Sequence, residues 1–142
     1  RALPYLAGAF TRLLQEYPWT TDGLSRSERR LLQLASAGAV DLRRVFPRMQ
    51  DGEEAYSMTD RSLLAMARDL SATDPALLEI LERIAEDFST GSVAVTDVGR
   101  QVLGGAVDRV TTCGVDRWIG GVHLQRDSVW RWNPESGSIV GG

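Results

Sequence analysis

The sequence predicts an α+β fold, with an N-terminal helical bundle of helix-turn-helix type and a small C-terminal antiparallel sheet in a winged-helix-like arrangement. Two observations predict it. Apolar residues recur at helical spacing up to about residue 90, and they alternate along short runs bounded by glycines beyond that point. The 142 residues suffice for a single domain, in which we expect a helical part over about 1–90 and a β-rich part over about 91–135.

The first two helices are predicted from apolar spacing and from end signals. Residues 3–17 have the spacing of a helix with one buried stripe, and Pro18 ends it because proline disfavours the α region at the residue before it. Ser25 and Glu28 have the spacing of a capping box, so we expect a helix over 25–37. The stripe of the first helix comprises Leu3, Leu6, Phe10, Leu13, Leu14 and Tyr17.

Three further helices are predicted downstream. Asp41 is a candidate cap for a short helix ending near residue 48, and Thr59 or Asp60 begins a helix that ends near residue 70. Pro75 is suited to the first turn of a third helix, which apolar spacing extends to about residue 88. The apolar residues of this last helix are Leu77, Leu78, Leu81, Ile84 and Phe88.

The period of the pattern changes after the polar turn at residues 89–92. Val93 and Val95 alternate with small residues as in a short strand, and Thr96 then caps a brief helix that ends at Gly104 and Gly105. The remaining apolar runs, at residues 107–114, 115–124 and 128–133, are predicted as strands separated by glycine and polar turns.

Residues 116–132 hold three of the four tryptophans, the one histidine and a Gly-Gly pair. We interpret this stretch as a β-hairpin with loop residues 126–127, in which residues whose numbers sum to about 253 face one another. A loop at residues 127–128 would shift that sum to about 255. Either register makes the stretch a structural clasp, and Trp130→Ala is then expected to unfold the protein. The clasp residues are Trp118, Gly121, Trp130 and Trp132.

Nucleic-acid binding is one function that the sequence suggests. The exposed charges of the helix predicted over 60–70, namely Asp60, Arg61, Arg68 and Asp69, sum to zero, so that helix is poorly suited to lie against phosphates. The two earlier helices are more basic, and residues 1–50 hold eight Arg against four acidic residues. The candidate nucleic-acid contacts are Arg26, Arg29, Arg30, Arg43, Arg44 and Arg48.

A small site beside the tryptophans is a second candidate. Cys113 and His123 are the one Cys-His pair, too few for the four ligands of a structural zinc site, and we predict no catalytic residue, metal or cofactor from them. Asp-Arg pairs recur at residues 108–109 and 116–117, and they are typical of surface ion pairs. The candidate ligand or partner patch comprises Asp116, Arg117, His123 and Arg131.

Composition limits the class of protein. No apolar run approaches the roughly 18 residues of a membrane span, and we expect no membrane partner. One cysteine and no signal-peptide pattern are typical of a cytoplasmic protein. All sixteen basic residues are arginines, as GC-rich bacterial coding favours. The chain begins at Arg1, and we expect it to be a fragment of a longer protein.

Several motifs resemble one bacterial family. "LPYL", "GLSRSERRLL", "VTDVGRQVLGG" and "DRWIGGVHL…VWRW" are similar to the C-terminal part of a family described only as a domain of unknown function, frequent in actinobacteria and proteobacteria. The resemblance implies a preceding N-terminal domain. It implies no chemistry, so no residue inherits a role from it.

These observations favour a non-catalytic interaction or regulatory module, winged-helix-like, that serves an N-terminal domain or a protein partner. The alternatives are nucleic-acid binding through the Arg-rich helices at 25–48, or part of an enzyme with an Asp/Arg site near the Trp-rich hairpin. The sequence leaves the oligomeric state open.

Overall fold

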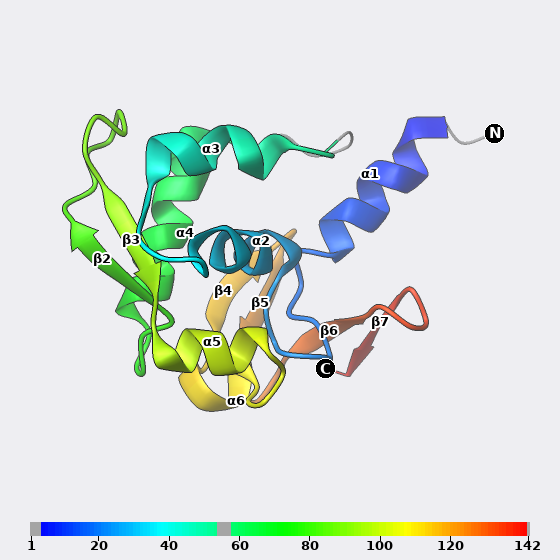
Figure 1. Cartoon of the computed structure of the whole chain (residues 1–142). Coiled ribbons are helices and arrows are strands. Elements are labelled where there is room, and N and C mark those ends of the chain that lie inside the picture. The colour runs from blue at the N-terminus through cyan, green and yellow to red at the C-terminus, as the bar shows by residue number, and fades with distance from the viewer. Residues whose placement is uncertain (1–3, 54–57, 142) are drawn as a thin grey trace.

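The computed structural model describes residues 4–53 and 58–141. It has the α+β class that the sequence predicts, with the helices mainly in the first half and hairpins at the C-terminal end (Figure 1). The helices are α1 (Pro4–Leu14), α2 (Arg26–Ala35), α3 (Leu42–Gln50), α4 (Asp60–Ala72), α5 (Asp97–Leu103) and α6 (Arg109–Cys113). The strands are β1 (Val40–Asp41), β2 (Leu78–Glu82), β3 (Ser92–Val95), β4 (Asp116–Ile119), β5 (Val122–Gln125), β6 (Trp130–Asn133) and β7 (Ser138–Gly141).

The helix starts follow the capping signals in the sequence. The Ser25 hydroxyl accepts a hydrogen bond from the Glu28 amide, and the Glu28 carboxylate accepts one from the Ser25 amide, which completes the predicted capping box of α2. Asp41, Thr59 and Thr96 likewise cap α3, α4 and α5, as predicted. Each cap satisfies a backbone donor that the first turn of a helix would otherwise leave unpaired.

A three-stranded antiparallel sheet lies at one end of the molecule, in the order β1-β3-β2. Val93 of β3 faces Val40 of β1 on one side and Ile80 of β2 on the other. Helix α4 packs on β2, and α2 packs on β3, α3 and α5. Fully buried leucines from the helices and the sheet form the main core, including Leu31, Leu32, Leu42, Leu63, Leu70, Leu77 and Leu78.

The prediction of a helix from Pro75 to about residue 88 is wrong. Residues 78–82 form strand β2, in which Leu78 pairs with Val95, and residues 83–91 form the loop to β3. Ile84 and Phe88 are buried from that loop, and Phe88 packs edge-on against Phe46 with ring centroids 5.9 Å apart. The apolar spacing fits a helix, but pairing with the alternating strand β3 decides the conformation.

The C-terminal part contains two separate hairpins and a second, smaller core. Strand β4 pairs with β5, and β6 pairs with β7, in two-stranded antiparallel sheets. Residues 107–114, predicted as a strand, instead contain α6, because the Asp108 side chain caps a helical turn by accepting from the Thr111 amide. The second core consists of Tyr17, Val110, Val115, Leu124 and Trp132.

The predicted register of the Trp-rich hairpin is also wrong. Gly120 and Gly121 form the turn between β4 and β5, with φ angles of 54° and 83°, so residues that sum to 241, such as Trp118 and His123, face one another. Two positive φ angles fit a type I′ turn, whose twist matches that of the strands. Two glycines adopt these angles more readily than Arg126 and Asp127 would. Of the pairing predicted around residues 126–127, one isolated bridge between Gln125 and Ser128 is present. Strand β6 pairs with β7 and not with β5.

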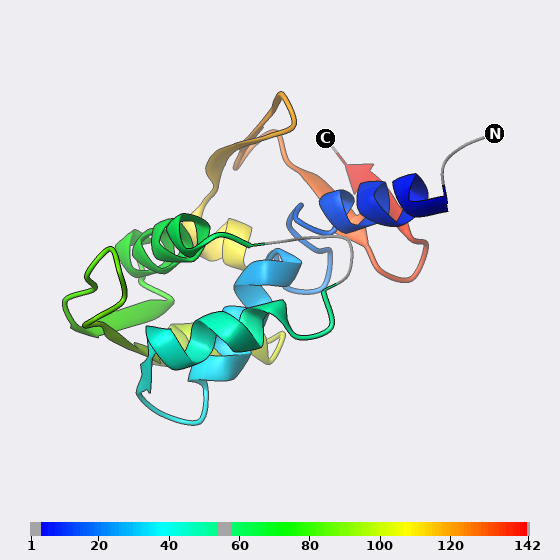
Figure 2. The same ribbon diagram turned by 90° about the horizontal axis from the view of Figure 1, so that it is seen from above.

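Strand β6 also forms backbone hydrogen bonds with the segment that follows α1. The Trp132 amide donates to the Pro18 carbonyl and the Trp132 carbonyl accepts from the Thr20 amide, both at 2.9 Å, so Trp19 and Trp132 form a parallel bridge. Strand β6 is therefore joined directly to the segment after α1, at the end of the molecule opposite the three-stranded sheet (Figure 2).

Candidate functional site

Helix α1 exposes its apolar side. We call Leu6, Phe10 and Leu13 the α1 face, and their exposed fractions are 57%, 59% and 41%. Tyr5, which is 86% exposed, lies seven residues before Arg12 and thus on another side of the helix. The predicted buried stripe is therefore wrong for most of the helix, and of its described members Tyr17 alone is buried. In both views α1 extends away from the three-stranded sheet (Figures 1 and 2).

The orientation of α1 follows from the ion pairs on its other side. The Arg12 side chain is 5% exposed, and its guanidinium contacts Glu16 at 2.6 Å, Glu53 at 2.8 Å and the Ser27 hydroxyl at 3.2 Å. Arg12 thus anchors α1 to the start of α2 through its polar side. Because Arg12 lies on the opposite side of the helix from Phe10 and Leu6, that anchor turns the α1 face outward.

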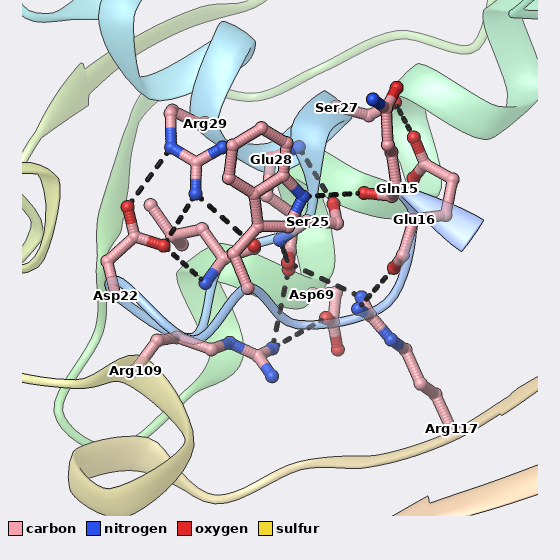
Figure 3. A network of polar contacts seen from close by, with 12 residues as sticks. Gln15, Glu16, Asp22, Ser25, Ser27, Glu28, Arg29, Asp69, Arg109 and Arg117 are labelled. Atoms are coloured by element: carbon pink, nitrogen blue, oxygen red, sulfur yellow. Dashed lines mark hydrogen bonds and ion pairs between the residues drawn. The ribbon is translucent and has the colours of Figure 1, made fainter. Parts of the chain in front are cut away.

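The anchoring contacts continue from α1 into a polar network (Figure 3). The Trp19 indole donates to the Gln15 carbonyl at 2.9 Å, and the Arg26 guanidinium donates to the Gln15 side chain at 2.7 Å. Arg29 forms an ion pair with Asp22 at 2.6 Å and lies 4.0 Å from the centroid of the Trp19 ring. These contacts hold the end of α1 and the following turn against α2.

Glu28 lies at the centre of the network and is 2% exposed. Its carboxylate lies 3.4 Å from Arg117 of β4 and 3.5 Å from Arg109 of α6. Arg109 is itself 3% exposed and also contacts Asp69 of α4 at 3.5 Å (Figure 3). One buried carboxylate therefore joins α2 to the C-terminal part of the chain.

The electrostatic environment keeps Glu28 ionised. Burial by itself would raise the pKa of Glu28, but the charges of Arg117 and Arg109 and the hydrogen bonds with Ser25 outweigh it. The pKa of Glu28 is consequently below its ordinary value of 4.5. Asp108 behaves similarly: burial opposes ionisation, yet the bidentate pair with Arg131 lowers its pKa.

Stability is expected to fall in acid because of these two carboxylates. A group whose pKa is lower in the folded state contributes stability above its unfolded pKa and loses it as the pH falls through the folded pKa. The free energy of unfolding should therefore be flat above about pH 5.5 and decline below about pH 4.5. Urea unfolding followed by circular dichroism from pH 3 to 7 measures this. The Glu28→Gln variant should show a shallower decline, and an equally steep one would contradict the assignment.

The structure divides the six arginines predicted to contact nucleic acid. Arg26 and Arg29 take part in the internal network described above. Arg30 donates to the Arg48 backbone carbonyl at 3.4 Å, and Arg43 lies 3.7 Å from its neighbour Asp41. Arg44 and Arg48 are exposed on α3 and line a hollow of about 440 Å³ together with Leu34, Ala39, Val40, Asp41 and Val45.

The four residues of the predicted patch near the tryptophans do not form one site. His123 stacks on Trp118, with centroids 4.5 Å apart, and contacts Asp116 at 2.5 Å on the exposed side of the β4–β5 hairpin. Arg117 points to the other side of the hairpin, where it donates to the Glu16 carbonyl. Arg131 forms its ion pair with Asp108, separately from these residues.

The predicted clasp residues also have separate environments. Trp132 is 5% exposed in the second core, whereas Trp118 and Trp130 are 68% and 43% exposed. Gly121 lies in the β4–β5 turn, where an added methyl group would contact nothing within 4 Å, so no indole covers it. Of the four residues, Trp132 alone occupies the position that a clasp requires.

Chemical groups for catalysis or metal binding are sparse. Burial raises the pKa of the Cys113 thiol, which donates to the Pro75 carbonyl at 3.3 Å, so this thiol is not activated. Within residues 4–53 and 58–141, no group of three or more His, Cys, Asp and Glu residues is placed to hold a metal ion. Across the same residues, no helix combines the length and apolar character needed to cross a membrane.

Comparison with protein-family models, curated proteins and solved structures finds no match to this chain.

Proposed function

We propose that this protein is a non-catalytic interaction module that docks through the α1 face into an apolar groove of a second folded domain. The observation that carries the proposal is the inverted orientation of α1, which buries Arg12 and exposes Phe10 and Leu6. Contiguous exposed apolar side chains of this size are typical of protein contact sites. Helix-in-groove recognition uses such residues at helical spacing as anchors.

The chemistry of the α1 face indicates the chemistry of the groove. Residues 5–11 and 13 carry no charged side chain, so an ion pair cannot contribute to docking along that stretch. Phe10 and the two leucines provide aromatic and aliphatic anchors for apolar pockets. We therefore expect a groove lined by apolar side chains.

A second copy of the chain is a less suitable occupant than a groove. Helix α1 has 11 residues and is about 16 Å long. A stable interface buries about 800 Å² on each partner. Two short helices that cross share only their point of crossing, whereas a groove encloses the whole exposed side of the helix.

The body of the protein supports a winged-helix-like scaffold for this contact. The elements run α2-β1-α3-α4-β2-β3, and β3 lies between β1 and β2 in the sheet. In such a scaffold α4 has the position of a recognition helix and the β2–β3 loop has the position of a wing. Residues 25–103 contain ten Arg and thirteen acidic residues, a balance that favours a protein contact over phosphate contacts.

Site-specific photocrosslinking in cells tests the proposal. A benzoylphenylalanine in place of Phe10 should form an adduct with one defined protein segment, and the same analogue in place of the exposed Gln101 on α5 should not. Mass spectrometry should map the adduct to apolar residues, either elsewhere in the same polypeptide or in a partner. Adducts between two copies of the chain, adducts on a charged surface, or equal labelling from position 101 would overturn the proposal.

A binding measurement with the identified segment provides the quantitative test. Leu6→Gln and Phe10→Gln should each weaken the affinity about tenfold or more, because buried apolar anchors dominate such interfaces. Leu81→Gln is the matched control, since Leu81 is 51% exposed but lies on β2. All three variants should keep the melting temperature of the parent protein, because exposed apolar side chains contribute little to folding.

A further inference from the structure

We propose that the cleft between α4, α6 and the β4–β5 hairpin is a binding site for a small oxyanion, such as a carboxylate or phosphate group. We call it the arginine cleft, and it has a volume of about 490 Å³. Its cationic side chains are Arg109 from α6, Arg117 from β4 and Arg126 from the turn after β5. The cleft is distinct from the α1 face, so its test does not depend on the proposed docking function.

The three arginines of the cleft differ in how many carboxylate partners they have. Arg109 and Arg117 share the carboxylate of Glu28, and Arg109 also reaches Asp69. Arg126 differs from both: among the described residues, no carboxylate lies within the 4.0 Å ion-pair distance of its guanidinium. Asp116, the other acidic residue of the cleft, is already in contact with His123.

The backbone at Gly114 positions two of the guanidinium groups. The Arg109 guanidinium donates to the Gly114 carbonyl at 3.3 Å. The Arg126 guanidinium packs over the α-carbon of Gly114, where a methyl group would lie 3.2 Å from the Nη2 atom. Gly114 has a φ of 77°, a conformation that favours glycine, so both its backbone and its lack of a side chain suit this arrangement.

The positive charge of the two groups reaches the interior of the cleft. Burial raises the pKa of Cys113, and the charges of Arg109 and Arg126 oppose this rise more than the charge of Asp74 adds to it. Cys113 lines the cleft together with these arginines and Thr73. A small anion at this position would therefore meet a favourable potential from more than one element of the fold.

Arginine geometry indicates the class of ligand. A guanidinium presents parallel N–H donors that match the paired oxygens of a carboxylate or phosphate, and such bidentate contacts are stronger than neutral hydrogen bonds. The Arg126 guanidinium has these donors without an acidic partner among the described residues, next to a cleft of sufficient volume for a small acid. An oxyanion would supply the missing acceptor.

Titration with inorganic phosphate and with acetate, followed by ¹⁵N NMR of the whole chain, tests the site. Saturable shifts should occur at the amides of Gly114 and Val115, and added sodium chloride should weaken them. Arg126→Ala should reduce the affinity about tenfold or more, and Arg126→Lys should have an intermediate effect. The two probes distinguish a phosphate site from a carboxylate site.

Arg83→Ala provides the matched control, because Arg83 is an exposed arginine on the β2–β3 loop. This variant should bind both anions as the parent protein does. The proposal is overturned if neither anion produces saturable shifts, if Arg126→Ala binds as tightly as the parent, or if Arg83→Ala weakens binding equally. Melting temperatures of all variants should match that of the parent, since both arginines are exposed.

Discussion

Glu28→Gln is expected to lower the free energy of unfolding by about 3–5 kcal/mol, because it leaves the buried Arg109 and the half-buried Arg117 without their shared counter-ion. The side chain keeps its shape, so the loss measures charge and not volume. Arg109 is 3% exposed and cannot recover hydration in place of this ion pair, and its remaining carboxylate partner, Asp69, is 61% exposed. Chemical denaturation at pH 7 measures the change.

Two further variants separate the ion pairs from other effects of the substitution. Glu79→Gln removes a carboxylate at an exposed position of β2 and should change stability by less than about 0.5 kcal/mol. Arg117→Met should be much less destabilising in the Glu28→Gln background than in the parent, since its partner is already absent. If the two effects simply add, Glu28 and Arg117 do not interact as the distance of 3.4 Å indicates.

The capping role of Glu28 could be predicted from the sequence, but its ion pairs could not. Ser25 and Glu28 are three residues apart, and local spacing suffices to define a capping box. Arg109 and Arg117 lie more than 80 positions further along the chain, in elements whose placement depends on the whole fold. Sequence alone interprets Asp108-Arg109 as a surface pair, whereas the fold buries Arg109 against α2.

The same limit explains the failed predictions for α1 and β2. Apolar spacing locates the helix of Leu6 and Phe10, but it does not reveal that Arg12 finds buried acceptors and turns the apolar side outward. The one sequence signal for this orientation is Arg12 itself, a charged residue that stands between the apolar residues Phe10 and Leu13. Around β2, the spacing of Leu77, Leu78 and Leu81 fits a helix, and only the pairing with β3 makes residues 78–82 a strand.

Trp132→Ala is expected to lower the free energy of unfolding by about 3–5 kcal/mol. The indole is 5% exposed and packs in the second core with Tyr17, Val110 and Leu124. Its removal leaves a cavity between the N-terminal segment and the C-terminal hairpins, which few neighbours can fill. Urea denaturation followed by far-UV circular dichroism measures the effect.

Trp130→Ala is the matched comparison, because Trp130 lies two residues earlier on the same strand and is 43% exposed. It should cost about 1 kcal/mol or less, since much of the indole remains in water in the folded state. The hairpin register expected from the sequence alone gives Trp130 the structural role, so the two variants distinguish the two arrangements. Equal destabilisation, or a larger loss for Trp130→Ala, would contradict the β6–β7 pairing and the placement of Trp132 against the segment after α1.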